Sequence, residues 1–167
     1  MKRSICALVM FMLCVSACLG QTESDIRKQI VGTWKLVSTE LIMKDGTTRP
    51  DPRFGLHSKG FLMYHANGYM CADLVNPDRP KWVDPAHPTT DEMAAAGGGT
   101  FAYCGHYEID VNHKQLVHLP EVATDPNYVG SRQIRPYTFQ DGRLVLGDVE
   151  KEDPAVARWK IVWEKAR

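Results

Sequence analysis

A short turn in this sequence predicts that a tyrosine and a histidine lie opposite each other on neighbouring strands. Asn112-His113 separates two alternating segments, and a two-residue hairpin loop there pairs Ile109 with Leu116 and Tyr107 with His118. All four side chains then share one face, which Ile109 and Leu116 mark as the interior. A Tyr–His pair in an apolar cavity can orient a carbonyl group or move a proton near neutral pH. The alternative is a cross-strand aromatic pair that serves packing alone.

An arginine is expected inside the same fold. Arg132 and Arg135 fall on opposite faces of one segment, and Arg135 shares its face with Tyr137 and Phe139. A buried guanidinium would bind a carboxylate or an enolate, because burying it unpaired costs free energy. The alternatives are an arginine in water at the rim, or one paired with a protein carboxylate such as Glu108. Tyr107, His118 and Arg135 are therefore the candidate catalytic residues.

Aromatic and methionine side chains supply candidates for the wall of a ligand cavity. Such side chains belong more often to a packed core, so a purely structural role stays open. The candidates are Tyr64, Met70, Trp82, Tyr103 and Tyr137.

The sequence lacks the common catalytic and cofactor motifs. It has no G-x-S-x-G, no phosphate-binding loop, no H-E-x-x-H and no C-x-x-C, and its six histidines do not share metal-ligand spacing. We therefore expect neither a cofactor nor a metal. Twenty basic residues balance twenty acidic ones without a basic cluster in the body, which argues against a nucleic-acid partner.

The elements that must position these residues are short alternating strands separated by turn residues. Asp45-Gly46, Asn67-Gly68 and Asp141-Gly142 are typical tight turns. Consecutive hairpins favour an all-β fold, an antiparallel up-and-down barrel of about eight strands, which removes exposed edges and leaves room for one small ligand. Trp34 is expected to plug the closed end. The predicted strands are Thr33–Leu41, Gly60–Ala66, Tyr69–Leu74, Phe101–Asp110, Gln115–Leu119, Val129–Gln140, Arg143–Gly147 and Ala157–Glu164.

Two segments depart from this strand pattern. Ser24–Gln29 is compatible with a helical turn or more, with Ser24 as its cap. Thr89–Ala96 predicts one short inserted helix, which the glycines 97–99 end. The proline-rich stretch before it, Asn76–Pro88, is expected to be a loop.

The first twenty residues have the features of an export signal. Lys2 and Arg3 precede an apolar run, Ile5–Ala17, which is shorter than the roughly 20 residues that a membrane span needs. We expect residues 1–20 to be a signal peptide, residues 21–167 to be one domain, and the protein to be secreted or periplasmic. The segment before Cys18 also resembles a lipobox, so a lipid anchor on Cys18 and simple cleavage after Gly20 are both open.

Two cysteines remain in the predicted domain, Cys71 and Cys104. An exported protein with two cysteines allows a disulfide. Each cysteine lies within a predicted strand, where a bridge needs one particular pairing, so two separate buried thiols are slightly preferred.

Several short motifs, in order, resemble the bacterial and fungal lipocalin-like domain family. The resemblance spans about Ile30 to Lys165 and implies a calyx for a small, largely apolar molecule. It brings no established catalytic set, although some barrels of this general type guide cyclisation or isomerisation in natural-product pathways. The motifs are Gly32-Thr33-Trp34, residues 60–64, 68–72, Arg79-Pro80, residues 102–108, 127–130 with Gln133 and Arg135, and 141–144.

Three functions follow as hypotheses. The first is an exported protein that binds a small hydrophobic or amphipathic molecule in its barrel. The second is a cofactor-free isomerase or cyclase that acts on a polyketide- or terpenoid-like metabolite in the same cavity. The third is an envelope protein whose filled barrel serves only as an interaction module. A cavity inside the barrel would distinguish the first two from the third, and the sequence leaves the oligomeric state open.

Overall fold

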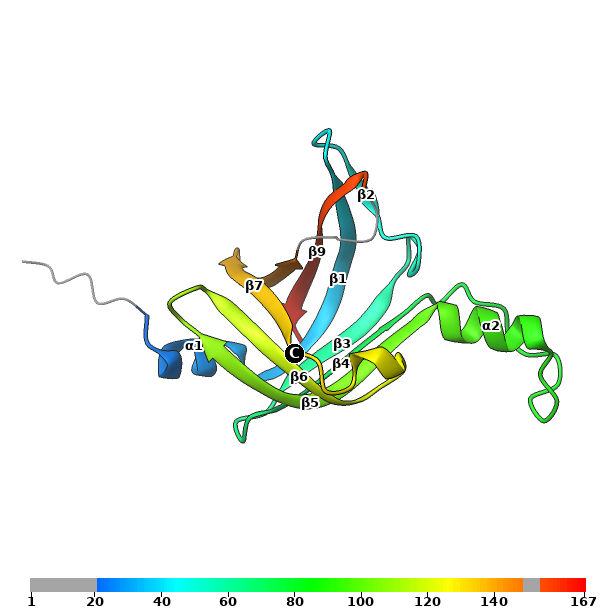
Figure 1. The fold of residues 1–167 in the computed structure, drawn as a ribbon, viewed down its shortest axis with the longest axis horizontal. Helices are drawn as coiled ribbons and strands as arrows, with labels where there is room; N and C mark the ends of the chain where they lie inside the picture. The colour runs from blue at the N-terminus through cyan, green and yellow to red at the C-terminus, as the bar shows by residue number, and fades with distance from the viewer. Residues whose placement is uncertain (1–20, 149–153) are drawn as a thin grey trace, which may run out of the picture.

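The computed structural model describes residues 21–148 and 154–167, which form one β-barrel with two α-helices (Figure 1). The predicted signal segment, with Cys18, lies outside the described residues. The elements are α1 (Glu23–Ile30), β1 (Gly32–Met43), β2 (Thr48–Pro50), β3 (Lys59–Tyr64), β4 (Tyr69–Val75), α2 (Thr90–Gly98), β5 (Thr100–Asp110), β6 (Gln115–Ala123), the 3₁₀ turn η1 (Pro126–Tyr128), β7 (Gln133–Gln140), β8 (Arg143–Asp148) and β9 (Val156–Lys165).

The strands pair in chain order, and the sheet closes on itself. Every pairing is antiparallel, and β9 returns to pair with β1, so eight strands form a closed barrel. The predicted all-β, lipocalin-like architecture is thus confirmed. The short strand β2 pairs with Glu40–Ile42 of β1 outside this ring, because β3 occupies the same edge of β1 only over Gly32–Lys35.

The helix α1 and the indole ring of Trp34 close one end of the barrel. Ile26 and Ile30 of the helix are fully buried, and Trp34 Nε1 donates to the Ile30 carbonyl at 2.7 Å. Lys165 lies over the Trp34 ring, with Nζ 4.3 Å from its centroid. Trp34 thus lies where the sequence predicted. The cap of the helix is Thr22, two residues before the predicted Ser24, because Thr22 forms a reciprocal capping box with Asp25.

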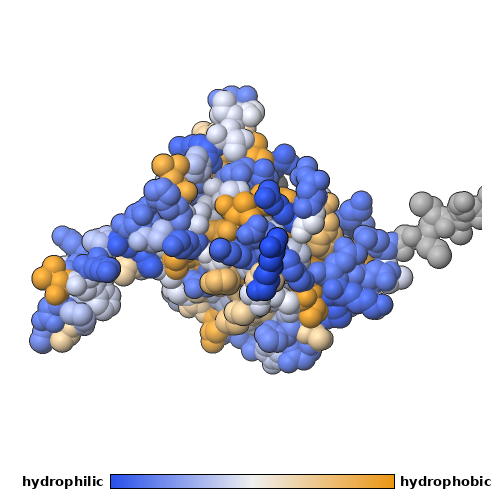
Figure 2. Space-filling model, turned by 180° about the vertical axis from the view of Figure 1, so that it is seen from behind, coloured by the Kyte–Doolittle hydropathy of each residue, from blue (hydrophilic) through white to orange (hydrophobic). Residues whose placement is uncertain are grey.

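The connection between β4 and β5 projects from the barrel as an arm that carries α2 (Figure 1). Thr89 caps the predicted helix α2, but the helix continues through two glycines to Gly98 and has no buried residue. Arg79 holds the base of the arm by donating to the carbonyls of Asn76 and Ala96 at 2.7 and 2.9 Å. Seen from behind, the surface mixes polar and apolar groups, and the arm stands clear of the barrel (Figure 2).

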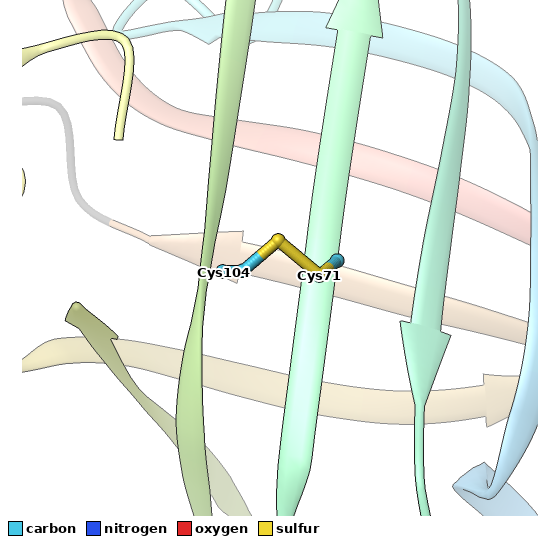
Figure 3. The surroundings of a disulfide bond; sticks show 2 residues. All are labelled: Cys71 and Cys104. Atoms are coloured by element: carbon cyan, nitrogen blue, oxygen red, sulfur yellow. A yellow bond between two sulfur atoms is a disulfide. The ribbon is translucent and has the colours of Figure 1, made fainter. Parts of the chain in front are cut away.

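Cys71 and Cys104 form a disulfide between neighbouring strands, so the preference for two separate thiols is wrong (Figure 3). The two residues are direct cross-strand partners in the β4–β5 ladder, and their Cα atoms are 4.1 Å apart. The arm lies between the two cysteines in the sequence. Because no short turn connects their strands, the register that pairs them could not be predicted.

The turn between β5 and β6 and the start of β7 differ from the prediction. The β5–β6 turn contains four residues, 111–114, yet it preserves the predicted register, with Tyr107 opposite His118 and Ile109 opposite Leu116. The predicted strand from Val129 begins only at Gln133, because Asp125 caps a 3₁₀ turn that includes Tyr128.

Candidate functional site

A cavity of about 260 Å³ lies within the barrel, away from α1. Its volume is near the lower end of ligand pockets, which run from about 300 to 1,000 Å³. Even an apolar cavity of about 150 Å³ can hold benzene. The space is therefore sufficient for a small organic molecule.

One side of the cavity is apolar and largely aromatic. Strands β3, β4, β8 and β9, the start of β5 and the loop after β2 supply these side chains because alternate residues of each strand face inward. They are Phe54, Leu62, Ala72, Leu74, Phe101, Leu146, Trp159, Ile161 and Trp163.

The other side is polar, and its centre is Arg135 of β7. The Arg135 side chain is only 5% exposed. Its guanidinium donates to Asp148 Oδ2 and Gln133 Oε1, each at 3.1 Å, and to the Tyr128 hydroxyl, and it lies 4.9 Å from the centroid of Trp159. Burial tends to lower the pKa of Arg135, but Tyr103, Tyr128 and Asp148 outweigh it, so the pKa is raised and the cation persists.

His118 of β6 lies beside this arginine and contacts two tyrosine hydroxyl groups. Nε2 is 2.6 Å from Tyr64 Oη, and Nδ1 is 2.8 Å from Tyr103 Oη. Burial lowers the pKa of His118 well below its usual value, and the charge of Arg135 lowers it further, so the ring is neutral at pH 7. Burial also raises the pKa of Tyr103 to about 12, so this hydroxyl keeps its proton.

The mouth of the cavity carries paired charges. Arg53 binds Asp51 at 2.8 Å, and Lys160 binds Glu40 at 2.8 Å. Each of these two cations already has a carboxylate partner, so neither is left to attract an anionic ligand. Selection therefore depends on the deeper groups.

The structure brings together some of the predicted site residues and separates others. His118, Tyr103 and Arg135 line the cavity, and Arg135 faces inward while Arg132 binds Glu108 on the outside. Tyr64 lies behind His118 rather than on the cavity wall.

Tyr107 is the cross-strand partner of His118, as predicted, but its side chain lies at the closed end and its hydroxyl does not bond to the imidazole. Its hydroxyl donates to the His65 carbonyl at 2.9 Å and accepts from Arg27 of α1 at 3.0 Å. Direct cross-strand pairing put both residues on one face, but their hydroxyl and imidazole groups have other partners.

Three predicted ligand-lining residues also lie outside the cavity wall. Met70 is buried in the core, and Tyr137 pairs with Leu146 but is not part of the wall. Trp82 is 40% exposed on the projecting arm, because the loop that carries it leaves the barrel.

Sequence reasoning missed Tyr128 and the aromatic residues of β9. Asp125-Pro126 signals a turn before Tyr128, and Tyr128 belongs to the motif 127–130 noted above. Trp159, Ile161 and Trp163 alternate with charged neighbours, a pattern that predicted the strand and could also have placed them on the cavity wall.

Two properties of the described residues bear on metals and membranes. Within residues 21–148 and 154–167 no group of three or more His, Cys, Asp or Glu side chains is arranged to hold a metal ion. None of the helices in those ranges has the length and hydropathy to span a membrane.

The chain was compared with known proteins. A family described as the lipocalin-like domain matches residues 31–166. No curated protein matches the chain.

Proposed function

The chain belongs to the lipocalin-like domain family, and from this premise we propose that its barrel binds a small amphipathic molecule. The observation that carries the proposal is the two-sided cavity of about 260 Å³. Trp159, Trp163 and their apolar neighbours would cover the hydrocarbon part of the ligand. Arg135 and the tyrosine hydroxyl groups would contact its polar end.

A filled barrel that serves only as an interaction module is the less supported alternative. Burying a guanidinium beside an internal cavity is costly unless polar partners compensate it. In a barrel that only provides a scaffold, packed apolar side chains would stabilise the same region without this cost.

A cofactor-free isomerase or cyclase remains a second candidate, because hydroxyl donors beside a cation can stabilise an oxyanion. The low pKa of His118, which burial causes, makes the imidazole a weak base at neutral pH. A general base works best when its pKa is near the working pH. We therefore place binding first, and conversion of the bound molecule by the purified protein would instead establish catalysis.

Filling the cavity tests the proposal. Ala72 lines the cavity and is 3% exposed, so Ala72→Phe should occupy the space that a ligand needs. Val122→Phe is the matched control, because Val122 is 62% exposed on the outer face of β6. The measurement is native mass spectrometry of protein purified from its own organism.

We expect one small molecule per chain in the wild type and in Val122→Phe, and none in Ala72→Phe. Overpacking of this kind costs about 1–3 kcal/mol, so thermal unfolding should confirm that the variant is folded. An empty wild type, or a molecule retained by folded Ala72→Phe, would contradict the proposal.

We also propose that the protein is exported. The basic and apolar pattern of residues 2–17 supports this, and so does the Cys71–Cys104 disulfide, since disulfides persist in oxidising compartments. Export could end in lipidation of Cys18 or in simple cleavage after Gly20.

A further inference from the structure

The two tyrosines that contact His118 cannot both donate to it. A neutral imidazole has one N–H donor and one acceptor nitrogen. Tyr64 Oη is 2.6 Å from Nε2 and Tyr103 Oη is 2.8 Å from Nδ1. One tyrosine therefore donates its hydrogen to the ring, and the other accepts the hydrogen of the ring.

The surroundings of Tyr64 show which tyrosine donates to the imidazole and which accepts from it. Tyr64 is 1% exposed and does not line the cavity, and among the described residues its hydroxyl has only His118 as a hydrogen-bond partner. If Tyr64 accepted from Nε2–H, its own hydrogen would stay buried without an acceptor, which costs free energy. Tyr64 therefore donates to Nε2, and Nδ1–H donates to Tyr103.

This arrangement leaves the hydroxyl hydrogen of Tyr103 free at the cavity wall. Tyr128 is in the same position, because its oxygen accepts from Arg135 and the described residues offer no acceptor for its hydrogen. The Trp163 Nε1–H is buried and likewise has no partner among them. Three cavity-lining residues thus carry donor hydrogens that the described part of the chain leaves without acceptors.

We propose that the ligand presents an oxygen acceptor, a carbonyl or a carboxylate, to the Tyr103 and Tyr128 hydroxyls beside Arg135. His118 is then a positioning residue, since it turns the Tyr103 hydrogen toward the ligand. This inference rests on the binding function proposed above. It adds the chemical class of the polar group.

Three probes that share one ring system test the class. They are 2-acetylnaphthalene with a neutral carbonyl, 2-naphthoate with a carboxylate, and 2-ethylnaphthalene with no acceptor. Dissociation constants come from quenching of tryptophan fluorescence in the purified protein. We expect at least one acceptor probe to bind about tenfold or more tightly than the ethyl probe, the effect of one good hydrogen bond. The comparison of ketone and carboxylate shows whether the acceptor is charged.

Variants assign the effect to residues. Tyr103→Phe and His118→Leu should each reduce the preference for the acceptor probe by about tenfold. The ratio to the ethyl probe within each variant cancels general changes in the cavity. Tyr69→Phe is the matched control. Tyr69 lies on the outer face of β4 and is 44% exposed, so the substitution removes a hydroxyl group far from the cavity.

The tautomer of His118 gives an independent readout that needs no variant. Nitrogen-15 NMR of the imidazole should show the proton on Nδ1, and a proton on Nε2 would overturn the assignment. Equal affinities for all three probes would overturn the acceptor class and leave the binding function standing. Failure of every probe to bind would count against both proposals.

Discussion

His118 is held neutral inside the barrel between two tyrosine hydroxyl groups, and this has a consequence for stability. Burial lowers the pKa of the folded-state imidazole well below its usual value. The unfolded chain titrates near a pKa of about 6.5, so between these two values it binds more protons than the folded protein. Stability therefore falls as the pH drops below about 6.5.

We predict that the titration of His118 lowers the free energy of unfolding by up to about 1.4 kcal/mol for each unit that the pH falls within this window. Urea unfolding at pH 7, 6 and 5 measures it. The slope should be smaller in His118→Leu than in the wild type. His106→Gln, on the outer face and paired with Glu121, controls for removing a histidine. Equal slopes for the wild type and His118→Leu would show that the buried ring does not titrate as described.

At the scale of strands and turns, alternation in the sequence predicted the face of each residue but not its depth. Tyr107, Met70 and Tyr137 are all buried, as expected of inward-facing residues, yet none reaches the cavity. A period of two residues distinguishes the two sides of a strand and carries no information on height along the barrel. Depth depends on the strand register and on which end α1 covers.

The turns explain which parts of the site could be predicted. The β5–β6 hairpin is local, so its register followed from the turn, and His118 was placed correctly. The β4–β5 pairing spans the arm, so the partner of Cys71 could not be derived from a nearby turn. Tyr128 was missed because a 3₁₀ turn replaces the start of a predicted strand.

The disulfide should stabilise the β4–β5 ladder. It joins residues that are 33 positions apart and so restricts the unfolded chain, an effect of about 2–4 kcal/mol. We predict that the double variant Cys71→Ser, Cys104→Ser has a lower melting temperature by calorimetry. A reducing agent should lower the melting temperature of the wild type and leave that of the double variant unchanged. Equal melting temperatures for the double variant and the oxidised wild type would contradict the prediction.

At the scale of the whole molecule, the proposed export has two possible endings. If Cys18 carries a lipid, Cys18→Ala should release the protein from the membrane fraction into the soluble exported fraction. If the signal is simply cleaved, the wild type should already be in the soluble exported fraction, and the substitution should change nothing. Fractionation with immunoblotting separates these cases. A wild type that retains Met1 in the cytosol would contradict export altogether.

The arm between β4 and β5 is a position where another sequence could replace the native one. The Asn76 amide donates to the Gly99 carbonyl at 2.8 Å, so the ladder closes before the arm begins, and α2 buries no residue. Replacing residues 77–98 with Asn-Gly should leave a tight hairpin whose melting temperature stays within about 5 °C of the wild type, since surface changes rarely exceed about 0.5 kcal/mol. A larger loss would show that Arg79 anchors more than the arm itself. Retained stability would make this position a grafting site, where a binding loop or a reporter could be exchanged without altering the calyx.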